Sequence, residues 1–497
     1  MTTGATQSGL TQPFTSDAGM SEQYDLIVIG SGPAGEKGAA QAAYFGKRVC
    51  LIERAPRPGG AAVNTGTIPS KALRETALYF SGLRQRGLYG VDYTVKENIT
   101  VADFMFRERT VVEAEWKLID DNLKRHGIEQ IQGAARLVDP HTVEVTRYGE
   151  EPRHLTGKFI LVATGSHPQK PEGVDVDGDV IVDSDTLLLL DRIPGQMIVI
   201  GGGVIGCEYA CTFAAMGVQV TIVNSRSRLL AHLDPEVSDA LRQQMTARLG
   251  IQVVLDAEVT AIAKDGNRGH VTIGGETTLS ADVVLYSAGR LGCVQDLGLE
   301  TVGVKTNNRH YIVVDDHYRT SVPSVYAAGD VIGFPALAST SMEQARVAVC
   351  HAFDLKYKQK VSSVLPYGVW TIPEIATVGE TPEQLTTRGQ EFEVGRSVFR
   401  TNPRGQIIGD TDGFVKLLFD PSDQRLLGVT VVGEGACELI HIGMGCLANE
   451  GTLDYFIQSV FNYPALADAY KYAAYDGLQA IARRFGRQTG MKQVKTS

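Results

Sequence analysis

The sequence predicts an α/β protein in which two copies of a strand–turn–helix–strand unit precede a C-terminal α+β region. Glycine accounts for 54 of the 497 residues, which is about 11% against a usual value of about 7%. Two glycine runs, beginning at Gly30 and Gly201, share the pattern G-x-G-x-x-G. At roughly 150 residues per domain, the length suits about three domains.

The first unit begins with the apolar segment 24–29, which predicts a buried strand. A glycine turn follows, and then an alanine-rich helix that ends at Phe45. Gly46 stands just after this helix, where a left-handed conformation is common. Segment 48–52 predicts a second strand, which ends at Glu53. In such Rossmann-type units the three glycines permit a tight turn, close approach of a pyrophosphate, and close packing of the helix.

The second unit repeats this order with a strand at 197–200, a helix that ends at Met216, and a strand at 218–223. In both copies the closing glycine, Gly46 or Gly217, lies sixteen residues after the first glycine of the turn. Each helix N-terminus would present free N–H groups to phosphates. One such pattern is a weak signal, but two in the same context predict two dinucleotide-binding sites.

The two units differ at the end of the second strand. Glu53 can accept a hydrogen bond from a ribose 2′-hydroxyl, whereas Asn224 holds that place in the second unit. A carboxylate about 4 Å from a phosphate charge would cost on the order of 4 kcal/mol at an effective dielectric near 20. Asn224 removes this repulsion, and Arg226 or Arg228 can pair with a 2′-phosphate. We expect the second site to accept NADP without excluding NAD; the alternative is that both arginines are solvated loop residues.

Composition argues against other classes of partner. The formal net charge of −10 opposes binding to nucleic acid and to anionic membranes, and no apolar run is long enough to span a membrane. The polar segment 1–23 has no secretory signal pattern and predicts a disordered tail. Seven scattered cysteines suit free thiols in the cytoplasm. Cys207 and Cys211 have no ligand cluster around them, so we expect no metal site.

Three further glycine-containing segments occur in a fixed order along the chain. They are ATGS at 163–166, YSAGR at 286–290 and YAAGD at 326–330. With the two units, they make the chain resemble, from 24 to 485, the flavoprotein disulfide reductases, the family of lipoamide dehydrogenase and glutathione reductase. The resemblance implies one non-covalent FAD in the first unit, NAD and NADP(H) as substrates in the second, and a homodimer or higher homo-oligomer.

The resemblance fails where the family has its redox-active disulfide. The segment 59–71 reads GGAAVNTGTIPSK, with Ala62 and Thr67 where the family has cysteines. Neither side chain can form a thiolate or a disulfide. Tyr463 stands where the family has a histidine, and with a reference pKa near 10 it is a poor proton carrier at neutral pH. These residues exclude disulfide reductase chemistry, and Thr67 is expected to contact the flavin instead.

Hydride transfer remains possible. By resemblance, Lys71 lies near flavin N5 and pairs with Glu208, while a helix that opens at 337–341 faces the N1–O2 edge of the flavin. Segments such as GTIPSKALR and FNYPALADAY are similar to the soluble pyridine nucleotide transhydrogenases, which keep a cysteine near the position of Ala62. The resemblance implies ping-pong hydride transfer between NADPH and NAD through FAD. Two alternatives stay open: an NAD(P)H:quinone or diaphorase-type reductase, and a non-catalytic flavoprotein sensor.

The resemblance also implies domain limits and site residues. We expect an FAD-binding domain at 24–165 and 291–355, an NAD(P)-binding domain at 166–290, and a dimerisation domain at 356–486. Strands are expected near Val378 and at 415–419 and 427–432, helices at 435–450 and 466–485, and a loose tail at 487–497. The expected catalytic residues are Lys71, Glu208 and Thr67. The expected cofactor-binding residues are Gly30, Gly32, Pro33, Ala34, Gly35, Glu53, Arg54, Gly60, Thr67, Lys71, Ala135, Thr164, Gly165, Ser166, Gly201, Gly203, Val204, Ile205, Gly206, Glu208, Asn224, Arg226, Arg228, Gly289, Arg290, Gly329, Asp330, Leu337, Ala338 and Ser339.

Overall fold

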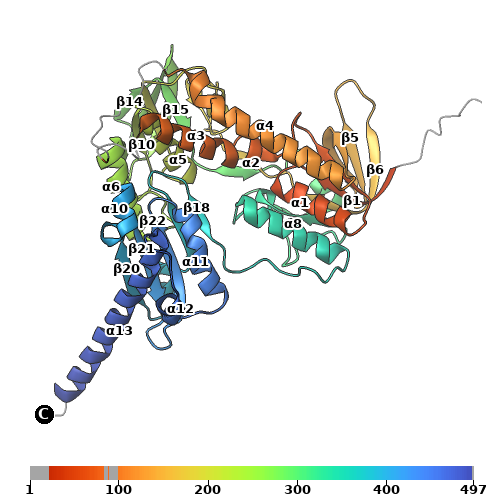
Figure 1. Ribbon diagram of the computed structural model, residues 1–497. Helices are drawn as coiled ribbons and strands as arrows, with labels where there is room; N and C mark the ends of the chain where they lie inside the picture. Colours follow the sequence, from red (N-terminus) through yellow and green to blue (C-terminus); the bar gives the residue numbers. More distant parts are fainter. Residues whose placement is uncertain (1–21, 83–87, 89–98, 495–497) are drawn as a thin grey trace, which may run out of the picture.

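The computed structural model describes residues 22–82, 88 and 99–494, and Figure 1 shows their arrangement. The first glycine unit forms a seven-stranded sheet of order β3-β2-β1-β6-β5-β4, with β17 paired to β6. Strands β1, β2, β3, β6 and β17 pair in parallel. Their bounds are β1 Glu22–Ile29, β2 Val49–Glu53, β3 Glu129–Gln132, β4 Ala134–Asp139, β5 Thr142–Thr146, β6 Arg153–Val162 and β17 Val325–Ala327.

Helices cover this sheet and extend the first unit. Helix α1 packs beside α8 on one face of the sheet, and Figure 1 shows the two side by side. Helix α4 begins with a capping box at Thr100, whose hydroxyl accepts from the Asp103 amide, and it packs on α3. The bounds are α1 Pro33–Tyr44, α2 Gly60–Asn64, α3 Thr67–Ser81, α4 Val101–Arg125, α7 Leu299–Val302, η2 Asp330–Ile332 and α8 Ala338–Ala352.

The second glycine unit forms a parallel five-stranded sheet of order β11-β10-β9-β15-β8 beside a three-stranded sheet, β12-β13-β14. Helix α5 is buried on almost every side because α3 and the sheet both pack against it. The bounds are β8 Ile181–Val182, η1 Thr186–Leu189, β9 Gln196–Ile200, α5 Val204–Ala215, β10 Gln219–Val223, α6 Pro235–Leu249, β11 Gln252–Val254, β12 Val259–Asp265, β13 Arg268–Ile273, β14 Thr277–Ala281 and β15 Val283–Tyr286.

Two short strands carry the chain between the units. They are β7 Ser166–Pro168 on the way out and β16 Arg290–Gly292 on the way back, and they pair antiparallel. The pairing places Ser166 opposite Gly292 and Arg290 opposite Pro168. Both crossings therefore run side by side at the junction of the two sheets.

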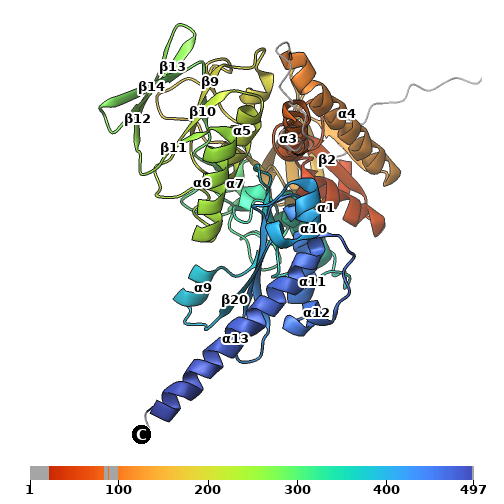
Figure 2. The same cartoon turned by 60° about the vertical axis from the view of Figure 1, so that its left-hand side comes forward.

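The C-terminal region is an antiparallel five-stranded sheet of order β18-β19-β22-β21-β20 with helices packed on it. In Figures 1 and 2 the last helix, α13, projects away from the rest of the molecule. The bounds are β18 Tyr367–Val369, β19 Ile375–Gly379, α9 Pro382–Thr387, β20 Glu393–Val398, η3 Phe399–Thr401, α10 Pro403–Ile408, β21 Phe414–Phe419, β22 Leu426–Val432, α11 Ala436–Ala448, α12 Leu453–Gln458, η4 Leu466–Asp468 and α13 Ala469–Val494.

Both predicted ends need correction. Helix α13 continues to Val494, so the loose tail expected at 487–497 is wrong over 487–494; 495–497 lie outside the described residues. A glycine such as Gly486 costs a helix interior about 1 kcal/mol relative to alanine, and α13 continues through it. The tail expected at 1–23 also ends too late, because Glu22 and Gln23 already pair with β6 through the backbone. The rest of that tail, 1–21, lies outside the described residues.

Candidate functional site

The main cavity opens where the two glycine units meet and has a volume of about 1200 Å³. This is larger than the usual range of ligand pockets, about 300–1,000 Å³, and suits a large ligand. Its walls come from the first unit, from α3, from α5 and from the C-terminal segment 366–370. The expected site residues that line it are Gly30, Gly32, Pro33, Ala34, Glu53, Arg54, Gly60, Thr67, Lys71, Ala135, Thr164, Gly165, Ser166, Val204, Ile205, Glu208, Arg290, Gly329, Asp330, Leu337, Ala338 and Ser339.

The other expected site residues do not line the cavity. Two of them, Gly35 and Gly206, are packed inside the turns, since a Cβ on either would lie within 2.0 Å of the carbonyl oxygen of Gly30 or Gly201 respectively. The third glycine of each turn therefore packs against the first, where a side chain has no room. The remainder are Gly201, Gly203, Asn224, Arg226, Arg228 and Gly289.

The first glycine of each turn has a conformation that only glycine adopts easily. Gly30 has φ +101° and Gly201 has φ +109°. A Cβ would lie 2.4 Å from the Ala163 carbonyl oxygen at Gly30 and 2.6 Å from the Ser287 carbonyl oxygen at Gly201. Ala163 follows β6, the neighbour of β1, and Ser287 follows β15, the neighbour of β9. The two turns are therefore built in the same way.

Three helices begin at these turns or at the cavity wall without a side-chain cap. They are α1 after Gly32, α5 after Gly203 and α8 after Leu337. No acidic residue lies in the first turn of α5 or α8. Their first amides and the positive ends of their dipoles remain available to anionic groups of a ligand.

Glu53 holds the first glycine turn as well as facing the cavity. One of its carboxylate oxygens accepts from the Ser31 amide at 2.9 Å and from the Ser31 hydroxyl at 2.7 Å, and the other accepts from the Ala55 amide at 2.8 Å. The oxygen that accepts only the Ala55 bond keeps a lone pair for a further donor. Glu53 can therefore fix the turn and bind a hydroxyl together.

The expected ion pair between Lys71 and Glu208 is present. Lys71 Nζ lies 2.6 Å from Glu208 Oε2, and Glu208 is nearly buried, with its side chain 7% exposed. The other Glu208 oxygen accepts from the Trp370 amide at 2.9 Å, and Lys71 Nζ lies 4.7 Å from the centre of the Trp370 ring. Lys71 lies two residues after Pro69 in the first turns of α3. Because Glu208 belongs to the nucleotide-binding unit and Trp370 to the C-terminal region, three parts of the molecule meet at the Lys71 ammonium group.

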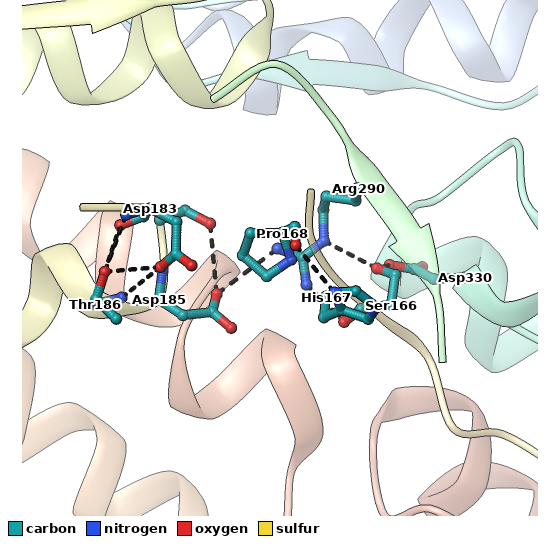
Figure 3. Close-up of polar contacts among 9 residues, drawn as sticks. Ser166, His167, Pro168, Asp183, Asp185, Thr186, Arg290 and Asp330 are labelled. Carbon is teal, nitrogen blue, oxygen red and sulfur yellow. Dashed lines mark hydrogen bonds and ion pairs between the residues drawn. The ribbon is translucent and has the colours of Figure 1, made fainter. Parts of the chain in front are cut away.

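Arg290 joins the two crossing strands, as Figure 3 shows. Its guanidinium donates to the Ser166 hydroxyl at 2.9 Å and to the Ser166 carbonyl oxygen at 2.7 Å. The Ser166 hydroxyl in turn donates to Asp330 Oδ2 at 2.8 Å. On the other side, Arg290 lies 3.7 Å from Asp185, a carboxyl whose pKa is raised by burial against the opposing effect of Arg290. This chain of contacts ties Asp330 to the nucleotide unit.

The loop after β10 differs from the sequence expectation. Asn224 is buried, and its amide accepts from the Gly202 amide and donates to the Arg226 and Arg228 carbonyl oxygens. Arg228 forms a bidentate ion pair with Glu383 at 2.8 and 3.0 Å. The Arg226 guanidinium is exposed and has no hydrogen bond or ion pair within the described part of the chain.

All seven cysteines are free and buried. Among the described residues that line the cavity, Cys293 is the only cysteine, and burial raises its pKa. Ala62 lies on α2 and Thr67 at the start of α3, and both line the cavity. Within the described ranges no cluster of histidine, cysteine and carboxylate residues could hold a metal ion.

Sequence reasoning missed three residues of this site. Trp370 and Asp185 come from segments without a local chemical pattern, so only their neighbours in space reveal them. The Tyr209 hydroxyl is buried in the cavity wall and has no partner in the part of the chain that the structure describes. Burial raises its pKa, so it stays neutral and can donate to a ligand. Its position next to Glu208 on α5 was the only available signal.

The two glycine-turn units and the cavity between them define the class of α/β proteins with paired dinucleotide-binding folds. Models of the pyridine nucleotide-disulphide oxidoreductases match residues 24–352, and models of the dimerisation domain of these proteins match residues 365–474. The chain belongs to this family of oxidoreductases. In the described ranges no helix has the length and apolarity needed to cross a membrane.

Individual relatives agree with this assignment. The chain is 44% identical over 456 residues to a soluble pyridine nucleotide transhydrogenase of Mycobacterium tuberculosis, covering 91% of this chain and 97% of that protein. A soluble pyridine nucleotide transhydrogenase of Colwellia psychrerythraea is 36% identical, covering 92% and 98%. Among solved structures, LpdA from Mycobacterium tuberculosis has a TM-score of 0.85 at 28% identity, covering 91% and 99%. The flavoprotein disulfide reductase RclA from Escherichia coli has a TM-score of 0.81 at 27% identity, covering 90% and 98%.

Proposed function

We propose that this protein is an FAD-dependent transhydrogenase that passes hydride between NADPH and NAD in one cavity, without a redox-active disulfide. The observation that carries the proposal is the wall of that cavity. Both glycine units and the Lys71–Glu208 pair line it, while the family's two cysteine positions hold Ala62 and Thr67. Relatives at 36–44% identity bear the same activity in their names.

The residues of the first unit fit FAD. The turn Gly30–Gly35 and the uncapped start of α1 present backbone amides to a pyrophosphate. Glu53 can accept from a ribose hydroxyl, and Asp330, oriented by Ser166, can accept from a further hydroxyl. When bound, FAD supplies a centre that accepts hydride from one nicotinamide and donates it to another. The uncapped start of α8 stabilises negative charge at the cavity wall.

The protein's own residues then position the second nucleotide. Val204 and Ile205, at the start of α5, line the same cavity as Lys71 and Glu208. Lys71 supplies a fixed positive charge, and Glu208, held by the Trp370 amide, prevents that charge from moving into solvent. The Trp370 ring, whose centre lies 4.7 Å from Lys71 Nζ, adds a cation–π attraction to the Lys71 ammonium group.

We also propose the domain limits expected from the sequence, with the first domain moved to begin at Glu22, because each of the three main sheets then falls within one of them. The dimerisation model over 365–474 supports a homodimer. Seven free, scattered thiols support a cytoplasmic location.

Turnover with two nucleotides tests the proposal. The purified protein is mixed with NADPH and thio-NAD, and formation of reduced thio-NAD is followed. We expect turnover that exceeds the rate with a quinone as acceptor. A higher rate with the quinone would favour a diaphorase-type reductase. No turnover with either acceptor, with FAD bound, would favour a non-catalytic sensor.

A further inference from the structure

The loop after β10 places one arginine in contact with another domain. Arg228 Nη1 donates to Glu383 Oε1 at 3.0 Å, and Arg228 Nη2 donates to Glu383 Oε2 at 2.8 Å. The Ala231 carbonyl oxygen accepts a further bond from Arg228 Nη2 at 2.9 Å. Glu383 lies in the first turn of α9, in the C-terminal region. Both terminal nitrogens of the Arg228 guanidinium therefore donate to a carboxylate that lies outside the nucleotide-binding unit.

The loop itself is held in a fixed position relative to the second glycine turn. Asn224 accepts from the Gly202 amide at 3.0 Å and donates to the carbonyl oxygens of Arg226 and Arg228 at 3.0 and 3.1 Å. In dinucleotide-binding units the residue at the end of the second strand faces the ribose, and a nearby arginine accommodates a 2′-phosphate. The Asn224 bonds therefore hold the backbone of both arginines beside the second glycine turn.

We propose that Glu383 is a specificity-determining residue, which withholds Arg228 from the 2′-phosphate of NADP and so keeps NAD and NADP(H) close in affinity. The proposal rests on the proposed function, because a ping-pong enzyme binds both nucleotides at one site. Arg226, exposed and unpaired within the described residues, remains as the cation for a 2′-phosphate. Glu383 also places a negative charge beside Arg228, and this charge repels a phosphate that approaches Arg228.

The Glu383 carboxylate and a 2′-phosphate compete for one guanidinium group, that of Arg228. A bidentate pair with a carboxylate uses the same two N–H groups that a phosphate would use. The side chains of Arg228 and Glu383 are 29% and 50% exposed, so solvent weakens the pair and does not abolish the competition. Without Glu383, Arg228 would gain a charge-assisted contact to the 2′-phosphate, and NAD, which has a hydroxyl there, would gain almost nothing.

The test measures binding of two probes that undergo no redox chemistry, 2′,5′-ADP and 5′-AMP, to the FAD-loaded protein by calorimetry. In Glu383→Gln we expect the affinity for 2′,5′-ADP to rise about tenfold, a value typical of one hydrogen bond to a charged group. The affinity for 5′-AMP should stay within about twofold of wild type. The matched control is Glu380→Gln, which removes an ion pair to Arg388 next to the same helix and should change neither affinity.

The double variant Glu383→Gln/Arg228→Leu should lose the gain, because the freed arginine causes it. A merely structural role of Glu383 would lower the affinity for both probes together. An unchanged ratio in Glu383→Gln, or a gain that survives Arg228→Leu, would overturn this inference alone. Failure of the wild-type protein to bind either probe would overturn the proposed function and this inference with it.

Discussion

Replacing Lys71 with methionine tests the ion pair at the centre of the cavity. Methionine keeps much of the length and apolar stem of lysine but removes the cation. Glu208 would then keep only the Trp370 amide as a partner, at 2.9 Å, with its side chain 7% exposed. The variant therefore leaves a nearly buried carboxylate without a counter-charge.

The magnitude follows from the distance between the charged atoms. Two unit charges 2.6 Å apart attract by about 6 kcal/mol at an effective dielectric near 20. Desolvation of both groups offsets part of this attraction, and loss of one partner of a buried pair costs about 3–5 kcal/mol. Because the Lys71 side chain is 24% exposed, we expect the lower end, about 3 kcal/mol.

Chemical unfolding of the FAD-loaded protein and the NADPH–thio-NAD assay give two readouts. Lys71→Met should lose about 3 kcal/mol of unfolding free energy and roughly a hundredfold in turnover. Lys71→Met/Glu208→Gln removes both charges, so its stability should return to within about 1 kcal/mol of wild type while turnover stays low. A Lys71→Met variant as stable as wild type, or a double variant no more stable than the single, would refute the reasoning.

Three further predictions concern buried charges away from the cavity centre. Lys416→Met should lower the unfolding free energy by about 3 kcal/mol, since it leaves the buried Asp234 carboxylate unpaired between α6 and β21; an unchanged denaturant midpoint would contradict this. Arg74→Met should also lower the unfolding free energy by about 3 kcal/mol, because it removes the ion-pair partner of Glu374. A loss of less than about 1 kcal/mol would contradict this prediction. Burial raises the pKa of Glu108, so folding disfavours its charged form and its contribution to stability falls as pH rises above about 4.5. Glu108→Gln should therefore raise Tm at pH 7, with a gain that shrinks toward pH 4; a gain independent of pH would argue against this cause.

The glycine units were predictable because their geometry is local. Gly30 and Gly201 need a positive φ, and Gly35 and Gly206 have no room for a Cβ, so the sequence pattern reflects steric requirements within a few residues. The helix ends at Gly46 and Gly217 follow from the same conformational freedom, with φ +73° and +91°.

Contacts between distant segments were predictable only through resemblance or not at all. Lys71 and Glu208 are 137 residues apart, and no local pattern joins them. Trp370 and Glu383 reach the site from the C-terminal region, where nothing in the sequence marks them as partners of Glu208 and Arg228. Their roles depend on how the domains pack, which is set by many weak contacts at once.

Anaerobic titration of the FAD-loaded protein with NADPH tests the central claim most directly. If the flavin is the only redox centre, about one equivalent of NADPH per FAD should bleach the visible flavin absorbance completely, since each nucleotide carries two electrons. Addition of NAD should then restore the absorbance. A requirement for about two equivalents would reveal a second two-electron centre such as a dithiol, and would contradict the account.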